Sequence, residues 1–284
     1  MSNRAFLAAA AATLLYACAS GGPAPAGLSF GYDVPTPPTA TYRMADTMTM
    51  IMDTPEGEMD MVMSSASTIE LTFAADSGGV RANGTVSDFS ASMASTMMGN
   101  MDLPAEAISG DLEFVIGPLG DVEMVSTPQM TGGGLPMAAP FQFNTQELFP
   151  RFPDRPLMPG DAWADTVTAS LGLEALGVPV PIEGIGEDPT IYNYTLVGDT
   201  VVDGRTVQKI ALSNVVSAQP SMEEAGETMA MDMVGTVEGF ILWDPERGLV
   251  AAVDLVRTVE GSMSMMGMSM TMTMAGPSKL RLIN

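Results

Sequence analysis

The sequence predicts a mainly β protein: one large antiparallel, strongly curved sheet or half-barrel of roughly ten to twelve strands, with long loops and little helix. Three observations lead to this prediction. Apolar and polar residues alternate with a period of two over most of the chain, which is typical of strands with one buried and one solvated face. Turn residues rich in glycine, proline and aspartate separate these segments. The alternating segments are long, which favours a curved sheet over a compact sandwich.

The residue pattern in the first half of the chain predicts two hairpins with one strand between them. The alternation begins near Ala40, and the turn residues at 55–58 predict a hairpin. A third strand is expected over 80–93. A further hairpin is expected to turn at 118–120.

The second half begins with an irregular stretch and ends with the most regular pattern. Over 127–186 the alternation mostly stops; we expect a crossover there, with a short helix around 145–149 and a strand over 163–170. Two hairpins follow, one turning at 203–204 and one about the DPERG residues 244–248. A last strand carries alternating methionines before the C-terminal KLRLI.

These patterns divide the chain into a signal peptide, a tether and one β domain. The domain also allows two pseudo-repeats joined by a loop-rich crossover. The predicted divisions are signal peptide 1–17, Gly/Pro-rich tether 18–39 and domain 40–284, with pseudo-repeats 40–126 and 187–275 and crossover 127–186.

The N-terminal segment has the three parts of an export signal. Arg4 precedes an apolar run over 5–16, which is too short to span a bilayer. The run closes on the residues LLYAC at 14–18, with a small residue before Cys18. This pattern resembles the lipobox of bacterial lipoproteins as a class.

The resemblance implies that Cys18 is the lipid attachment site. In that class the cysteine receives a diacylglyceryl group, the chain is cleaved before it and its new N-terminus is acylated; two acyl chains suffice for stable anchoring. Ala19 follows the cysteine where an aspartate would signal inner-membrane retention, so we expect an outer-membrane anchor with the domain facing the periplasm. The alternative is an ordinary secretory signal, cleaved near Ala19, with a chance cysteine.

Composition excludes many other functions. The chain has no histidine, which removes the commonest general base and metal ligand. Its single cysteine permits no intrachain disulfide and no thiolate metal cage. A net charge of −23 repels nucleic acid and anionic lipid surfaces, so membrane contact should come from the lipid anchor. We expect neither an enzyme nor a bound cofactor.

Two short motifs carry a second resemblance. The residues WDPERGLV at 243–250 resemble an aromatic-Asp-Pro-x-x-Gly-Leu turn that is common in envelope lipoproteins, including half-barrels of the LolA and LolB type. The residues PGDAW at 159–163 resemble a run found in bacterial lipoprotein domains with such sheets. The resemblance implies a similar architecture and transfers no site residues.

Methionine is the most unusual feature of the composition, at 27 residues. Many methionines alternate along strands, so that neighbours in this set share a sheet face. The methionines on these predicted faces are Met44, Met48, Met50, Met52, Met59, Met61, Met63, Met229, Met231, Met233, Met268, Met270, Met272 and Met274.

Three interpretations of the methionine faces remain open. Methionine can fill a core in place of leucine or isoleucine, because its flexible, polarizable side chain fits irregular gaps. The same faces, Met44 apart, can instead accept an acyl chain or another apolar ligand. In the third interpretation, thioethers bind Cu(I) or Ag(I), and the loop residues Met97, Met98 and Met101 are the candidate ligands.

Overall fold

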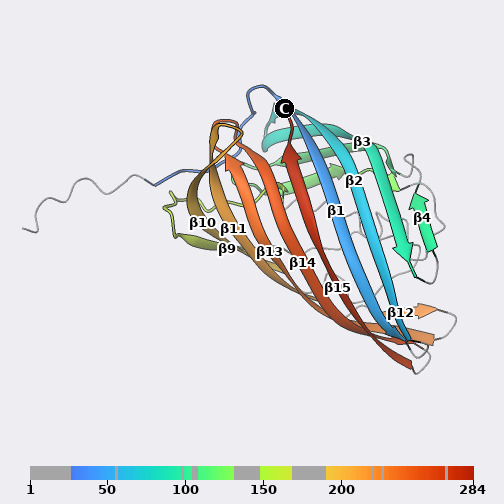
Figure 1. Cartoon of the computed structure of the whole chain (residues 1–284). Coiled ribbons are helices and arrows are strands. Elements are labelled where there is room, and N and C mark those ends of the chain that lie inside the picture. Colours follow the sequence, from blue (N-terminus) through green and yellow to red (C-terminus); the bar gives the residue numbers. More distant parts are fainter. Residues whose placement is uncertain are drawn as a thin grey trace, which may run out of the picture.

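The protein is an open, strongly curved sheet in a computed structural model (Figure 1). The structure describes residues 27–54, 57–96, 99–103, 108–130, 148–167, 190–218, 221–224, 227–265 and 268–284. Most of these residues are in strands, and a single helical residue, at 148, is described. The predicted fold class is therefore confirmed.

The strands are longest in the middle of the sheet. In chain order they are β1 (Thr39–Thr54), β2 (Gly57–Asp76), β3 (Gly79–Ser95), β4 (Gly99–Leu103), β5 (Ile108–Ser109), β6 (Asp111–Ile116), β7 (Val122–Ser126), β8 (Gln129–Met130), β9 (Ala162–Val167), β10 (Thr190–Val202), β11 (Arg205–Ala218), β12 (Ser221–Glu224), β13 (Glu227–Asp244), β14 (Leu249–Met265) and β15 (Met268–Leu282).

Thirteen of these strands form one unclosed sheet in the order β7-β6-β3-β2-β1-β15-β14-β13-β11-β10-β9, with β4 beside β3 and β12 beside β13. β5 and β8 form a separate pair. The strand pairs of the large sheet are antiparallel throughout the described residues. The first and last strands, β1 and β15, lie next to each other in its middle (Figure 1).

The predicted hairpins are confirmed by the pairing of β1 with β2, β6 with β7, β10 with β11 and β13 with β14. The alternating methionines at the C-terminal end and the residues KLRL at 279–282 belong to one strand, β15, which ends before Ile283. The short helix expected around 145–149 lies largely outside the described residues. The division into pseudo-repeats stays a prediction.

One face of the sheet, called the inner face below, carries the buried side chains. Along β1, Ala40, Tyr42, Met50 and Met52 are buried, and the other even-numbered residues between them are half-buried, whereas most odd-numbered residues are exposed. This period of two is the pattern that the sequence shows, and it places each strand's apolar side chains on the same side.

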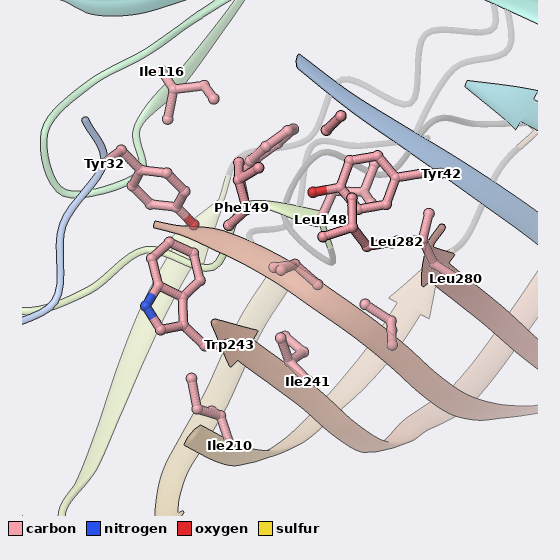
Figure 2. Close-up of a cluster of buried hydrophobic side chains, with 14 of the residues drawn as sticks. Tyr32, Tyr42, Ile116, Leu148, Phe149, Ile210, Ile241, Trp243, Leu280 and Leu282 are labelled. Atoms are coloured by element: carbon pink, nitrogen blue, oxygen red, sulfur yellow. The ribbon is translucent and has the colours of Figure 1, made fainter. Parts of the chain in front are cut away.

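Aromatic residues fill one end of the inner face. Two irregular segments, 27–32 and 148–157, lie over this end and are joined by backbone hydrogen bonds between Leu28 and Leu157. Figure 2 shows Tyr32 from the first segment beside Trp243 of β13, and Phe149 from the second segment beside Tyr32. The Tyr32 and Trp243 rings meet edge-on, with centroids 4.9 Å apart. This part of the core is therefore covered by the protein's own chain.

The Tyr32 hydroxyl is a polar group within this aromatic core, and it links the two irregular segments by a hydrogen bond. It donates a hydrogen bond of 3.0 Å to the carbonyl oxygen of Pro150. Burial raises the pKa of Tyr32 well above its ordinary value, and the neighbouring Tyr194 and Tyr42 raise it further. The hydroxyl therefore stays protonated and keeps its role as a donor.

The two motifs singled out in the sequence form turns beside this core. In WDPERG, the buried Asp244 carboxylate accepts hydrogen bonds from the backbone N–H groups of Glu246 and Arg247 and pairs with Arg205 at 3.1 Å. Gly248 ends the turn at a φ of +64°, where a side chain would be strained. The motif thus shapes the β13–β14 turn and orients Trp243 inward.

In PGDAW, Asp161 fixes a loop at the edge of the sheet. Its carboxylate accepts the backbone N–H of Met158 at 2.9 Å and pairs with Arg155 at 3.0 Å. Trp163 donates its indole N–H to the carbonyl oxygen of Arg151 at 2.8 Å and stacks on Tyr194. Both motifs therefore have structural roles in the described residues.

We predict that Asp161→Asn makes the free energy of unfolding less dependent on pH under acidic conditions. The hydrogen bond from Met158, followed by that from Arg155, lowers the pKa of Asp161 below its ordinary value of 3.8. Its stabilising contribution is therefore present above that value and is lost as the pH falls through the lowered pKa. Urea unfolding between about pH 5 and pH 2 measures this. The exposed Asp154→Asn controls for the loss of one carboxylate. A steeper acid response in Asp161→Asn than in the wild type would contradict the assignment.

Candidate functional site

The other half of the inner face carries a cluster of methionine side chains. We call this set the methionine cluster. Its buried members are Met50, Met52, Met61 and Met272, and its partly buried members are Met59, Met63, Met93, Met233 and Met274. Burying one such side chain contributes roughly 1.5–3 kcal/mol, so the cluster contributes substantially to the stability of this end of the sheet.

The pairing of β1 with β15 assembles the cluster. In the ladder, Met50 lies opposite Met61 of β2 and opposite Met274 of β15. Met52 likewise lies between Met59 and Met272. Directly opposed residues on one face have Cβ atoms about 4.5–5.5 Å apart. Thioethers from three strands therefore meet in rows, an adjacency that the sequence alone does not establish.

Other methionines of the predicted faces fall into three groups. Met48 lies opposite Met63 and is partly buried, and Met270 lies opposite Met263. For Met229, Met231 and Met268 the structure gives only backbone pairing, opposite Met222, Met263 and Met265 respectively. Met44 packs against the aromatic core instead of the methionine cluster.

Met93 belongs to the cluster, although it is not among the methionines of the predicted faces. It continues the inward alternation of Phe89 and Ala91 along β3, and it lies opposite Met63. That alternation is the signal that could have identified it.

The remaining candidates lie mainly outside the cluster. Met101 of β4 lies opposite Met93 and is 41% exposed, so a thioether is accessible at that point. Met97, Met98 and the candidate lipid attachment site Cys18 lie outside the described residues.

A band of polar side chains separates the methionine cluster from the aromatic core. We call Asp46, Ser65, Ser67, Arg257 and Ser278 the polar band. Ser65, Asp46 and Ser278 are direct neighbours across β2, β1 and β15. The three serines are buried, whereas the charged side chains of Asp46 and Arg257 keep about a quarter of their surface exposed.

An ion pair crosses the polar band. The Nη1 atom of Arg257 lies 3.4 Å from Oδ1 of Asp46, although β15 separates the strands that carry them. Gly276 is the residue of β15 directly opposite Arg257. Because Gly276 has no side chain, the guanidinium meets no obstacle from that residue as it reaches across to β1.

Gly276 also permits the close approach of β15 to β1. A Cβ atom there would lie 1.8 Å from the carbonyl oxygen of Thr47 and 2.8 Å from Cα of Met48. Such distances require the backbone of one strand to move. The absence of a side chain at Gly276 therefore permits both the close pairing of β15 with β1 and the ion pair between Arg257 and Asp46.

The described residues contain no group of three or more acidic, cysteine or histidine side chains placed to hold a metal ion. No helix in the described parts of the chain is long and apolar enough to cross a membrane. The chemistry that the methionine cluster and the polar band do provide is a flexible, polarizable apolar surface beside hydrogen-bonding groups.

Comparisons with known proteins do not identify a family for this chain. No protein-family model matches the chain, and no curated protein matches it in sequence. A similar solved structure is a domain from Vibrio parahaemolyticus that is assigned as an outer membrane lipoprotein-sorting protein. It is 12% identical, the match covers 85% of this chain and 86% of that chain, and the TM-score is 0.17. A TM-score of that size supports no conclusion about function.

We predict that Gly276→Ala lowers the free energy of unfolding by about 3 kcal/mol or more, because the added methyl group collides with backbone at the central strand pair. Urea unfolding followed by circular dichroism measures the change. Gly78→Ala is the matched control, since a Cβ there meets only a side-chain carbon at 3.9 Å. Equal stability of the two variants would show that β1 and β15 do not approach this closely.

Proposed function

We propose that the protein is a lipid-anchored, non-catalytic lipoprotein of the bacterial cell envelope that holds an acyl chain or another flexible apolar ligand. Cys18 is the proposed attachment site, in the outer membrane with the domain facing the periplasm. The methionine cluster on the inner face is the proposed ligand surface.

The observation that carries the ligand proposal is the joining of separate methionine faces into one surface. A core that needs only apolar volume is served by leucine, isoleucine and phenylalanine, and the aromatic end of the same face is built largely of such residues. The change to thioethers at the other end supports a surface that adapts to a ligand of variable shape.

A second candidate function is the binding of Cu(I) or Ag(I). It is favoured by the direct cross-strand neighbours Met50, Met61 and Met274 and by the accessible Met101 beside Met93. Thioethers are suitable ligands for these soft ions.

We predict that the native chain purified from membranes carries two or three acyl chains on Cys18. Mass measurement of the intact protein tests this, and Cys18→Ser should leave the chain unacylated and extractable without detergent. An unmodified native mass would overturn the anchoring proposal.

For ligand binding, we predict saturable binding of the neutral apolar probe N-phenylnaphthylamine to the full chain carrying Cys18→Ser. Adding Met59→Gln and Met63→Gln should weaken binding of the probe at least about fivefold. Each glutamine amide would have to give up its hydrogen bonds to water when an apolar ligand covers it, and the ligand offers none in return. Met124→Gln is the matched control, since Met124 lies in edge strand β7 and is 37% exposed.

The outcomes separate the two candidate functions. Displacement of the probe by palmitate or monopalmitoylglycerol supports acyl-chain binding. Failure to bind the probe, or equal weakening by the Met124 control, would overturn it. Saturable shifts of cluster methionine methyl signals at low Ag(I) stoichiometry, without displacement by lipids, would support the metal-binding candidate.

A further inference from the structure

The polar band lies where side chains of this face are expected to be apolar. Asp46 occupies an inward position of β1 between Met44 and Met48, and Arg257 occupies an inward position of β14 between Leu255 and Val259. A partly buried ion pair contributes little net stability, because its desolvation offsets its Coulombic attraction. Packing therefore does not account for charges at these two positions.

Ser67 is an independent indication that the band accepts a ligand. Its side chain is on the inner face, 4% exposed, and its Oγ atom is buried without a hydrogen-bond partner among the described residues. A buried polar atom without a partner is unfavourable, because it has given up its hydrogen bonds to water and has gained none in exchange. Ser67 lies two residues along β2 from Ser65, about 7 Å away on the same face, so a small group bound at the band can reach both hydroxyls.

The charges of the band indicate the kind of group that fits. Asp46 and Arg257 are oppositely charged and paired, so the band has no net charge to attract an ion. The chain as a whole carries −23, which disfavours an anionic head group. The band nevertheless offers a guanidinium donor, a carboxylate acceptor and serine hydroxyls that both donate and accept. This set suits a neutral group with several hydroxyls.

The methionine cluster begins directly beside the band. Six residues of β1 separate Asp46 from Met52, which corresponds to about 20 Å along the strand. A long acyl chain in extended form covers a comparable length. Its polar end would then lie at the polar band while its tail follows the rows of thioethers.

We propose that the polar band binds the neutral, hydroxyl-bearing head of an acylglycerol whose acyl chain lies along the methionine cluster. This inference rests on the acyl-binding function proposed above and names its ligand class. Ser67 supplies a hydrogen bond to the glyceryl hydroxyls, and the Asp46–Arg257 pair positions the head beside it.

The test uses the full chain carrying Cys18→Ser and measures displacement of N-phenylnaphthylamine by three lipids with the same tail. Monopalmitoylglycerol has the neutral hydroxyl-bearing head, methyl palmitate lacks the hydroxyls, and palmitate is an anion. We expect monopalmitoylglycerol to bind most tightly. Ser67→Ala should weaken its binding about three- to tenfold, as for the loss of one hydrogen bond, and should leave methyl palmitate unchanged.

Two further variants make the result interpretable. Ser67→Ala removes an oxygen that has no hydrogen-bond partner among the described residues, so we expect folding to be retained. Ser92→Ala, at an exposed position of β3, is the matched control with no expected effect. Asp46→Asn combined with Arg257→Gln removes both charges and keeps a polar side chain at each position. It should weaken the binding of monopalmitoylglycerol further, again without changing that of methyl palmitate.

The failures are distinguishable. If all three lipids displace the probe equally and Ser67→Ala changes none of them, the head-group site is wrong while acyl-chain binding stands. Tighter binding of palmitate than of monopalmitoylglycerol would overturn the neutral head group. If no lipid displaces the probe, acyl-chain binding fails and the head-group site fails with it.

Discussion

The antiparallel pairing of β1 with β15 is the constraint on which the rest of the structure depends. It joins two strands that are more than two hundred residues apart in the chain and places them in the middle of the sheet. Because side chains alternate between faces, a slip of one residue here would turn Met50 and Met52 to the outer face. The close contact of Gly276 with the backbone of Thr47 is specific to the observed register.

Different kinds of packing occupy the two ends of the inner face. At one end, rigid rings of Tyr32, Phe152 and Trp243 meet at centroid distances of 4.9–5.8 Å, and the protein's own irregular segments lie over them. At the other end, flexible thioethers pack against one another across strands. Aromatic rings have few rotamers and specify a single arrangement, whereas methionine adjusts to its neighbours. The sheet thus combines a preorganised half with an adaptable half.

Local patterns in the sequence were sufficient to predict the strands and their hairpins. The turns around Pro118 and at Asp203 are each determined by neighbouring residues, and the hairpin pairings of β1 with β2, β6 with β7 and β10 with β11 were each predicted correctly. The pairing of β1 with β15 was not predictable in this way, because no turn connects these strands. The methionine cluster depends on that pairing, so its assembly also required the structure.

The polar band was missed for a different reason. Asp46 and Arg257 are single charges within apolar alternations. Asp46 is one of 34 acidic residues and Arg257 one of 11 basic residues, and no local motif marks either of them. A charged residue at an inward position of a strand is nevertheless a detectable signal. Two such residues of opposite sign, on strands that flank β15, could have been identified together once the strand order was known.

The sheet tapers from its centre to its edges. Central strands such as β2 and β13 have 20 and 18 residues, whereas the edge strands β7 and β9 have 5 and 6. Open edges expose unpaired backbone groups that can template intermolecular aggregation, and short edges offer few of them. A protein whose sheet tapers in this way can be present at high local concentration without edge-to-edge aggregation, because each of its long strands is already paired on both sides.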